Sequence, residues 1–536
     1  MQKMIVLLSG HVASGKSTLA TLLHDRFNFE VIKTWQLLKS INPKIPQERE
    51  ALQAFGELLD KETNGQWVVE QLEQLIRTRR DFTVVIDSVR HQGQIDFVRK
   101  GYGTSVIHVH LKAPQDVLTS RYKNRENKDI QELGSFAELL KNETEKAVPE
   151  LEQSADVVVD TYLNSSEDVL TRAACHLGLF GRGYSRVVDV LVGGQYGSEG
   201  KGQIAAHLAP EYDVLVRVGG PNAGHSVYER PESVVFHSLP SGTLRSPRAQ
   251  IVIGAGAVVN VDTLWREIND FQLEFDRLTI DPQVMTISNH DIEREKKNVA
   301  AIASTGQGVG SATARRILDR GDASVLLARD VEKLKPYVRP AREVIENACR
   351  RQQKVFLEGT QGTALSLYHG SYPYVTSRDT TVAGCLAEAG ISPSRVRKVI
   401  MVCRTYPIRV QNPDGEGKTS GPMSQEISLE EIERRSGISL EVLKKTETTS
   451  TTRRKRRISE FSWSLLKMAA ELNAPTDIAL TFVDYISKVN QEARRFEQLT
   501  SETTRFIQEV ERVTEAPVSL ISTRFHHRCI IDRRTW

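Results

Sequence analysis

The sequence predicts an α/β protein with two parallel sheets, one in each of two units. Its apolar, β-branched runs are short, and each leads into a loop that carries Gly or Asp: 5–8, 82–86, 187–192 and 354–357. Buried parallel strands have this pattern, and ligands bind at the loops after the carboxyl ends of such strands. At 536 residues the chain is also too long for one ordinary core. We expect a smaller unit over 1–182 and a larger one over 186–536, joined by a Gly-bearing linker at 176–185.

Composition places the chain among globular proteins of a reducing compartment. Apolar residues make up 39% and charged residues 26%, and a net charge of +3 is too small to argue for a nucleic-acid or membrane partner. The five cysteines are scattered without a CxxC pair, which favours free thiols and gives no support to a zinc site. No apolar run approaches the roughly 18 to 20 residues that span a bilayer. We therefore expect a cytoplasmic protein with small-molecule substrates, no membrane partner and no nucleic acid.

The first unit opens on a phosphate-binding loop. The strand at 5–8 leads into GHVASGKS at 10–17, which fits the GxxxxGK[ST] pattern, and a helix is expected over 18–27. Amides of this loop would cradle a β-phosphate, the lysine would reach the β/γ oxygens, and the serine would bind Mg²⁺. The flanking strand and helix argue against a chance match on a Gly-rich turn. The expected ATP-binding residues are Gly10, Gly15, Lys16, Ser17 and Thr18.

Further residues of this unit suit phosphoryl transfer. Asp87 ends an apolar strand, and Arg90 and Gln94 follow it with the spacing R-x-x-x-Q. Arg121 and Arg125 are one helical turn apart, and forked guanidiniums bind phosphoryl oxygens, although a solvated basic helix face is the alternative. With these positions the segment resembles nucleoside monophosphate kinases. The resemblance implies an acceptor site at Asp87, Arg90 and Gln94, and a lid that carries Arg121 and Arg125.

The second unit opens on another Gly-rich loop, GGQYGSEGKGQ at 193–203, directly after a strand. Its glycines let backbone amides approach an anion and Lys201 adds a positive charge. A helix is expected over 203–208, and its N-terminus would face a phosphate. A further Gly-rich segment, GGPNAGH at 219–225, follows closely. Together the two segments supply these candidate site residues: Gly197, Ser198, Glu199, Gly200, Lys201, Gly202, Asn222, Gly224 and His225.

These segments resemble the opening signature of adenylosuccinate synthetases, a QWGDEGKGK-like loop followed by NAGH. Further family segments follow in the same order: LPSG at 239–242, STGQGVG at 304–310, EGTQGT at 358–363 and YPYVTS at 372–377. The resemblance implies that Ser198, His225 and Lys201 occupy catalytic positions, and that the carbonyl of Gly224 binds Mg²⁺. The residues that it implies around the bound nucleotide are Gly197, Glu199, Gly200, Gly202, Asn222, Thr305, Gln361 and Thr376.

The run TTSTTRRKRR at 448–457 resembles the aspartate-binding loop of the same family. Hydroxyls and forked guanidiniums are the groups that bind two carboxylates. The resemblance implies that aspartate is bound by Thr451, Thr452, Arg454 and Arg456. Taken alone, five cations in a row would instead suggest a nucleic-acid patch or a localisation tag.

Three departures from the family pattern point in one direction. The guanine-reading TKxD has become TFVD at 481–484, which keeps Asp484 but puts Phe482 where the lysine was, and STGP has become STRF at 522–525. The third is Ser198, which stands where the family carries its catalytic aspartate. A branch of the family from phages with 2,6-diaminopurine DNA has serine there, uses ATP-type donors and acts on dGMP. The resemblance to that branch implies a Mg²⁺-dependent ligase that uses ATP or dATP to join L-aspartate to C6 of dGMP, fused to a nucleotide kinase.

The sequence leaves other functions open. These are an IMP-dependent adenylosuccinate synthetase that tolerates serine, a nucleotide sensor without turnover, and a kinase whose second unit is a scaffold. A hydroxyl of ordinary pKa is a poor base, so we expect Ser198 to hydrogen-bond the purine or water. Family members usually dimerise and pass an arginine into the neighbour's site, so we expect a homodimer, with Arg315, Arg316 and Arg320 as the candidates.

Overall fold

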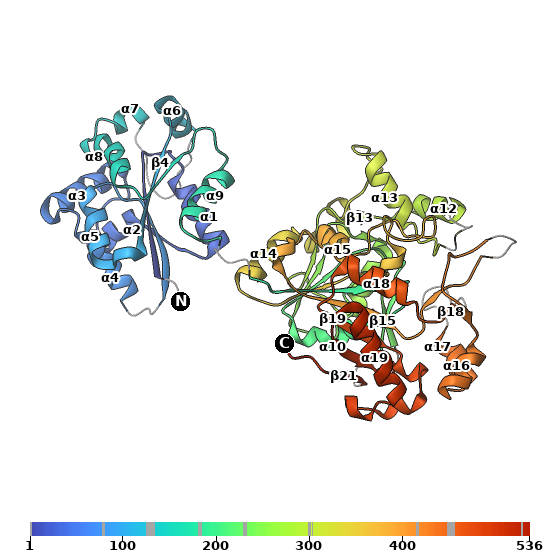
Figure 1. The fold of residues 1–536 in the computed structure, drawn as a ribbon. Coiled ribbons are helices and arrows are strands. Elements are labelled where there is room, and N and C mark those ends of the chain that lie inside the picture. The colour runs from blue at the N-terminus through green and yellow to red at the C-terminus, as the bar shows by residue number, and fades with distance from the viewer. Residues whose placement is uncertain are drawn as a thin grey trace. The chain divides into compact units, whose positions relative to one another are not determined.

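The chain folds as two compact units, Met1–Arg182 and Gly183–Trp536, each of which has helices packed around a sheet (Figure 1). The computed structural model describes residues 3–77, 81–124, 134–180, 185–228, 233–298, 302, 304–413, 418–447, 456–526 and 529–536. Within these ranges, no helix has the length and apolar character that crossing a membrane requires.

The first unit is a five-stranded sheet in the order β2-β3-β1-β4-β5, with every neighbouring pair parallel. Helices cover both of its faces, which is why the apolar side chains of the central strand β1 are buried. Its elements are β1 (Lys3–Ser9), α1 (Lys16–Phe27), β2 (Glu30–Lys33), α2 (Thr34–Ile41), α3 (Arg49–Thr63), α4 (Trp67–Ile76), β3 (Phe82–Asp87), α5 (Gln92–Tyr102), β4 (Val106–Lys112), α6 (Gln115–Lys123), α7 (Phe136–Leu139), α8 (Glu143–Ala147), β5 (Val157–Asp160) and α9 (Ser166–His176).

The second unit is built on a nine-stranded sheet in the order β12-β10-β7-β14-β6-β15-β19-β20-β21, parallel except for the last pair. The elements from its start to β14 are β6 (Val188–Gly193), α10 (Lys201–Leu208), β7 (Val214–Arg217), β8 (His225–Tyr228), β9 (Ser233–Phe236), β10 (Gln250–Ile253), β11 (Val258–Val259), α11 (Val261–Asp270), β12 (Leu278–Ile280), β13 (Met285–Thr286), α12 (Asn289–Asn298), α13 (Val309–Leu318), α14 (Ala341–Arg350) and β14 (Val355–Glu358).

The rest of the unit adds strands on the other side of β6 and a small three-stranded sheet, β16-β18-β17. Its elements are α15 (Val382–Ala389), β15 (Val396–Arg404), β16 (Ile408–Val410), β17 (Glu426–Ile427), α16 (Leu429–Ser436), α17 (Leu440–Thr446), β18 (Arg456–Ser459), α18 (Trp463–Asn473), β19 (Asp477–Thr481), α19 (Ser501–Thr514), β20 (Val518–Ser522) and β21 (Ile530–Asp532). The predicted fold class, two α/β units with parallel sheets, is confirmed.

Both phosphate loops turn into their helices earlier than predicted. Helix α1 begins at Lys16 and α10 at Lys201, in each case directly after a glycine in the left-handed region, Gly15 (φ 97°) and Gly200 (φ 87°). A residue with a Cβ is disfavoured in that conformation, so the last glycine of each loop sets the point where the helix starts. The lysine of each loop is therefore the first residue of a helix, at the end that attracts anions.

Strand register gathers the site of the second unit at the carboxyl edge of its sheet. Strand β14 lies between β7 and β6, and pairing places Glu358 beside Arg217. On the other side of β6, pairing of β15 with β19 places Arg404 beside Thr481. All of these residues end their strands, so they surround the loop that follows β6.

Candidate functional site

A cavity of about 810 Å³ lies beside the phosphate loop of the first unit. Its walls come from that loop and α1, from the ends of β2 and β3, and from α2, α3 and α4. Eight predicted residues line it: Gly15, Lys16, Ser17, Thr18, Asp87, Arg90, Gln94 and Arg121. Gly10 belongs to the loop but not to the lining, and Arg125 lies outside the described residues.

The loop itself has the geometry of a phosphate cradle. Gly10 has φ 128°, and a Cβ there would lie 2.1 Å from a carbonyl oxygen of β4, so only glycine fits. Lys16 Nζ donates to the carbonyl oxygens of Gly10 (2.8 Å) and His11 (2.7 Å). Ser17 Oγ donates to Asp87 Oδ2 at 2.7 Å, which places a hydroxyl beside a carboxylate. Such hard oxygen donors are the ligands that Mg²⁺ prefers, so this pair fits the ion.

Two of the predicted acceptor residues that line the cavity, Arg90 and Gln94, are held by other side chains. Arg90 pairs with Glu145, which is fully buried. Gln94 accepts from the Arg90 amide (2.9 Å) and donates to Asp60 Oδ1 (2.9 Å), and Trp67 Nε1 donates to the same oxygen (2.7 Å). Burial raises the pKa of the Asp60 carboxyl. Arg90 and Gln94 therefore shape the wall of the cavity through fixed polar contacts.

Two buried histidines beneath this loop make the first unit sensitive to acid. Ser9 Oγ lies 2.6 Å from His108 Nε2 and 2.8 Å from His110 Nδ1. Burial lowers the pKa of each histidine to about 4, so both are neutral in the folded state at pH 7. In the unfolded chain they titrate near 6.5, so the unfolded state binds more protons as the pH falls from 6.5 to 4 and the free energy of unfolding decreases.

We predict a loss of about 2 kcal/mol per histidine in the free energy of unfolding of the first unit between pH 7 and pH 5. Urea unfolding of the full chain at the two pH values measures it. His110→Gln removes one titrating group and should reduce the pH dependence by about half. Equal free energies of unfolding for the first unit at pH 7 and pH 5 would contradict the prediction.

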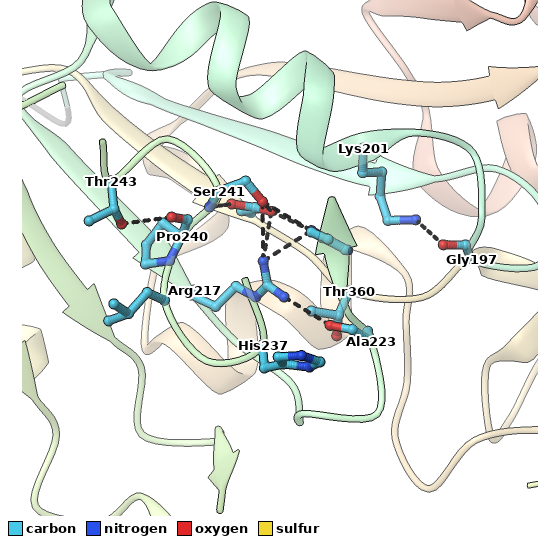
Figure 2. Close-up of polar contacts among 12 residues, drawn as sticks. Gly197, Lys201, Arg217, Ala223, His237, Pro240, Ser241, Thr243 and Thr360 are labelled. Atoms are coloured by element: carbon cyan, nitrogen blue, oxygen red, sulfur yellow. Dashed lines mark hydrogen bonds and ion pairs between the residues drawn. The ribbon is translucent and has the colours of Figure 1, made fainter. Parts of the chain in front are cut away.

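A buried ion pair, Glu199 with Lys201, holds the phosphate loop of the second unit. Glu199 Oε1 accepts from the amides of Gln195 (3.0 Å) and Gly197 (2.8 Å), and its Oε2 accepts from Lys201 Nζ at 2.5 Å. Glu199 and Lys201 are each only 1% exposed. Lys201 also donates to the Gly197 carbonyl at 3.1 Å, as Figure 2 shows. Both oxygens of Glu199 are engaged, so this carboxylate holds the shape of the loop.

Ser198 lies in the same loop and is half-buried. Its carbonyl accepts from Arg404 Nη1 at 3.4 Å. Among the described residues, none forms a hydrogen bond with the Ser198 hydroxyl. The hydroxyl is therefore available to a ligand.

His225 belongs to a buried cluster with Glu358, Arg217 and Ser241. His225 Nδ1 lies 2.5 Å from Glu358 Oε1, which also accepts from Arg217 Nη1 at 2.8 Å and from Ser241 Oγ. Figure 2 shows the Arg217 guanidinium between Ser241 and the carbonyl of Ala223, to which Nη2 donates at 3.2 Å. The other ring nitrogen, His225 Nε2, is buried and has no partner within the described parts of the chain.

The charges of this cluster fix the tautomer of His225. Burial, and then the Arg217 charge, lower the pKa of His225 to about 4. Burial opposes ionisation of Glu358, but Arg217 together with the hydrogen bonds from His225 and Ser241 lowers its pKa to about 2. An ionised carboxylate can only accept, so Nδ1 carries the proton. Nε2 consequently presents a lone pair.

The predicted nucleotide residues lie on the loops around these strands. Gln361 Nε2 donates to Thr376 Oγ1 at 2.5 Å, while Gln361 Oε1 and Asn222 Oδ1 are buried without a partner in the described structure. A Cβ on Gly220 would lie 2.7 Å from Val309 at the start of α13, so the Asn-Ala-Gly-His segment adjoins the loop that carries Thr305.

The predicted donor and aspartate sites are described in part. Burial raises the pKa of Asp484 to about 6; its Oδ2 accepts from Gln491 Nε2 at 3.1 Å, and its Oδ1 is buried without a partner in the described structure. Of the predicted aspartate ligands, Arg456 Nη1 lies 3.3 Å from Glu447 Oε2. Thr451, Thr452 and Arg454 lie outside the described residues.

Sequence reasoning missed several residues of this site and misplaced one. Arg217 was not predicted, and Ser241 and Glu358 were seen only as parts of matching segments. Arg217 and Glu358 end β7 and β14, and this strand-end position is the signal that could have found them. Arg315, a candidate for crossing to a neighbouring subunit, is buried and pairs with Asp291 (Nη2 to Oδ2, 2.6 Å). It is therefore committed within its own chain, which makes it a poor candidate.

Two phosphate loops at the carboxyl edges of parallel sheets, one of them beside a buried histidine–carboxylate pair, define a nucleotide-binding α/β enzyme. Two family models match the chain: "Adenylosuccinate synthetase" over residues 190–329 and 323–491, and "AAA domain" over residues 5–142. The chain belongs to the adenylosuccinate synthetase family. It combines a ligase of that type with an N-terminal, kinase-like P-loop domain.

Known relatives and structures support this assignment. The adenylosuccinate synthetase of Methanocaldococcus jannaschii is 37% identical over 354 residues, covering 64% of this chain and 96% of that protein. That of Pyrococcus horikoshii is 34% identical and covered to 98%. A solved succinoaminodeoxyadenylate synthetase of cyanophage S-2L, bound to dGMP and dATP, is 28% identical with a TM-score of 0.54, covering 66% of this chain and 96% of its own. Plasmodium falciparum adenylosuccinate synthetase shares the fold, with a TM-score of 0.56 at 20% identity over 65% of this chain and 100% of its own.

Proposed function

We propose that the second unit joins L-aspartate to C6 of dGMP, with ATP or dATP as phosphate donor. The observation that carries this proposal is Ser198, a half-buried residue of the phosphate loop whose hydroxyl has no hydrogen-bond partner in the described structure. In the family pattern a catalytic carboxylate occupies this position. A hydroxyl is smaller and uncharged, and it leaves room for the 2-amino group of guanine. The similarity to the cyanophage enzyme bound to dGMP and dATP supports the same substrates.

His225 takes over the role of proton acceptor in this proposal. In the family reaction, O6 of the purine attacks the γ-phosphate as the N1 proton leaves, and the aspartate amine then displaces phosphate from C6. The lone pair on His225 Nε2 accepts the N1 proton. The imidazolium that forms is stabilised by ionised Glu358 at 2.5 Å, and it can donate to an oxygen of the transferring group.

Mg²⁺ neutralises charge on the donor phosphates when it is bound. The second unit would hold it through the Gly224 carbonyl and neutral oxygens, because Ser198 supplies no carboxylate and both oxygens of Glu199 are engaged. Lys201 and the amides of the loop would therefore stabilise more of the negative charge on the donor phosphates than they would with a carboxylate-held Mg²⁺.

The first unit, we propose, is a kinase for a purine deoxynucleoside monophosphate. Its cavity is lined by the phosphate loop and the Ser17–Asp87 pair, and also by Trp35, Trp67 and Arg49. Tryptophan rings suit a purine and an arginine suits its phosphate. ADP formation with a panel of nucleoside monophosphates tests this activity, and a sugar acceptor in their place would contradict it.

A second candidate for the ligase is adenylosuccinate synthesis from IMP. It is favoured by the archaeal adenylosuccinate synthetases, which match at 37% and 34% identity against 28% for the cyanophage enzyme. Detection of the aspartate adduct by mass, with dGMP or IMP as the only nucleotide acceptor, separates the two. A protein that forms neither adduct would leave the two non-ligase functions, a nucleotide sensor or a kinase whose second unit is a scaffold.

Ser198→Asp should switch the preference of the ligase from dGMP toward IMP. A carboxylate there can accept the N1 proton of hypoxanthine, but it crowds the 2-amino group of guanine. Overpacking costs about 1 to 3 kcal/mol, or roughly a 5- to 150-fold change in preference. The measurement is kcat/KM for dGMP and IMP in both proteins, at saturating aspartate and ATP. If the wild type favours IMP, or the variant keeps its preference for dGMP, the dGMP assignment is wrong.

The ligase should use ATP or dATP in preference to GTP. Guanine offers two adjacent donors, N1–H and the 2-amino group, whereas adenine offers one amino group. Gln491 already donates to Asp484 Oδ2, so a guanine that needs both oxygens would compete with Gln491, whereas Oδ1 has no partner in the described structure. The test is kcat/KM with each donor, and Gln491→Ala should raise the value for GTP relative to ATP. A wild-type preference for GTP would contradict this interpretation of the pocket.

A further inference from the structure

The cavity of the first unit contains a carboxylate that phosphoryl transfer does not use. Asp60, near the end of α3, lines this cavity together with Glu57, which lies one helical turn before it. The carboxylate that suits Mg²⁺ in the same cavity is Asp87, which accepts from Ser17 of the phosphate loop. A carboxylate repels the phosphates of a nucleotide, so Asp60 is suited to another part of the acceptor.

Three helices meet at Asp60 and fix the direction of its carboxylate. Oδ1 accepts from Trp67 Nε1, at the start of α4, at 2.7 Å and from Gln94 Nε2, in α5, at 2.9 Å. The amide of Gln94 is held in this orientation because its Oε1 accepts from the Arg90 amide at 2.9 Å. Trp67 and Gln94 are each 3% exposed. Oδ1 therefore already has two donors, as many as its lone pairs.

The backbone around this junction is also tightly packed. A Cβ on Gly93 would lie 1.9 Å from the carbonyl oxygen of Asn64, and a Cβ on Gly65 would lie 2.4 Å from the amide nitrogen of Gln94. Gly65 also has φ 84°, a conformation that favours glycine. The turn after α3 thus packs directly against the first turn of α5, which keeps Gln94 beside Asp60.

The second oxygen of Asp60 keeps the capacity to accept. Oδ2 receives only the longer contact from Gln94 Nε2, at 3.1 Å. Glu57 is held in a similar way, because its Oε1 accepts from Asn142 Nδ2 at 2.6 Å and from Thr144 Oγ1 at 3.0 Å. Within the described structure, no donor contacts Glu57 Oε2. The two side chains therefore leave one accepting oxygen each, on the same stretch of the cavity wall.

Carboxylate oxygens accept hydrogen bonds and cannot donate them, and this distinguishes one purine from another. Guanine has two adjacent donors, N1–H and the 2-amino group, whereas hypoxanthine has only N1–H. Adenine has one amino group beside N1, which is an acceptor. Guanine therefore gains two hydrogen bonds to charged oxygens, while adenine gains one and turns a lone pair toward a carboxylate.

We propose that Asp60, together with Glu57, selects guanine as the acceptor base of the first unit. The acceptor is then a guanine nucleoside monophosphate, and Gln94 orients Asp60 instead of contacting the base. Asp60 takes no part in the transfer of the phosphoryl group, so its loss should raise KM for the acceptor more than it lowers kcat. This inference rests on the proposed nucleotide kinase activity and narrows its substrate.

The test is steady-state phosphorylation of dGMP, dIMP and dAMP by the full chain with ATP and Mg²⁺. The nucleoside diphosphate product is measured by chromatography in the absence of aspartate, so that the second unit forms no adduct. Since dIMP is dGMP without the 2-amino group, this pair isolates one donor. In the wild type, kcat/KM should fall in the order dGMP, dIMP, dAMP, with dGMP at least about tenfold above dAMP.

Asp60→Asn should reverse the chemistry of the accepting oxygen. Because Trp67 and Gln94 both donate to the Oδ1 position, the amide oxygen stays there and the amide nitrogen replaces Oδ2. A donor then faces the base, and the ratio of kcat/KM for dGMP to that for dAMP should fall at least about tenfold. The ratio does not depend on how much of the preparation is folded, since the same molecules process both acceptors.

Glu57→Gln is a second variant that decides the question if Asp60→Asn does not fold. Asn142 and Thr144 hold its amide oxygen, so the amide nitrogen replaces Oε2 and the same ratio should fall. Asp96→Asn is the matched control. Asp96 is an exposed residue of α5 that accepts from Gln92 and does not line the cavity, so this variant should keep the wild-type ratio and kcat.

Equal kcat/KM for dGMP and dAMP in the wild type, or an unchanged ratio in folded Asp60→Asn, would overturn the inference. Failure of the proposed function gives a different result, because no nucleoside monophosphate would then yield a diphosphate.

Discussion

His225→Ala should lower kcat for adduct formation about 10²- to 10⁴-fold, the usual contribution of a positioned proton acceptor. The variant loses the only imidazole of the cluster, while Arg217 still pairs with Glu358, so that carboxylate is not left alone. Single-turnover formation of the aspartate adduct from dGMP measures the effect. His207→Ala, a change at a partly exposed histidine on α10, is the control and should keep wild-type turnover.

Glu358→Gln tests whether this carboxylate fixes the tautomer of His225. The amide keeps the volume of the side chain but can also donate to Nδ1, which allows the tautomer with a proton on Nε2. We therefore expect a loss of similar size to that of His225→Ala, and a double variant only slightly worse than either one, because the two residues act as a unit. If the losses in kcat of the two single variants added up in the double variant, His225 and Glu358 would not act as a unit.

Lys16→Ala should abolish nucleotide phosphorylation by the first unit, by about 10²- to 10³-fold or more, while adduct formation by the second unit stays near wild type. The amine is the charge of its loop that can reach the β/γ oxygens, and each unit carries its own loop. ADP formation with nucleoside monophosphates and adduct formation with dGMP are measured on the same preparation. His225→Ala provides the reciprocal control, since it should spare the first activity. Loss of both activities in folded Lys16→Ala would show that the units are not independent.

Local patterns were sufficient to predict the sheets and both phosphate loops. The run at 187–192 and the glycines after it predict a strand and a turn directly, because each of these structures depends mainly on neighbouring residues. The same holds for GHVASGKS at 10–17. The starts of α1 and α10 were placed two residues too late, because left-handed Gly15 and Gly200 belong to the loop by composition but act as helix caps.

The polar supports of the site could not be predicted in the same way. Arg217 and Glu358 are 141 residues apart, and only the register of β7 and β14 makes them neighbours. Arg404 and its partner Glu447 are 43 residues apart, and a single sequence does not indicate which buried arginine pairs with which carboxylate. Within the described structure, His225 Nε2 and Asp484 Oδ1 have no partner because of how distant segments pack, so neither the tautomer of His225 nor the open oxygen of Asp484 could be predicted from the sequence.

Strand register has a consequence for how such a chain can diverge. The register of adjacent strands brings together Glu358 with Arg217 and Arg404 with Thr481, whatever the length of chain between them. Segments between strands can lengthen or shorten, and a whole unit can be added before β6, without changing this register. A single residue inserted within β14 or β15 would turn every later side chain of that strand to the opposite face. Divergence in this lineage should therefore appear as changes in loop length and as domain fusion, with the lengths of the central strands held fixed.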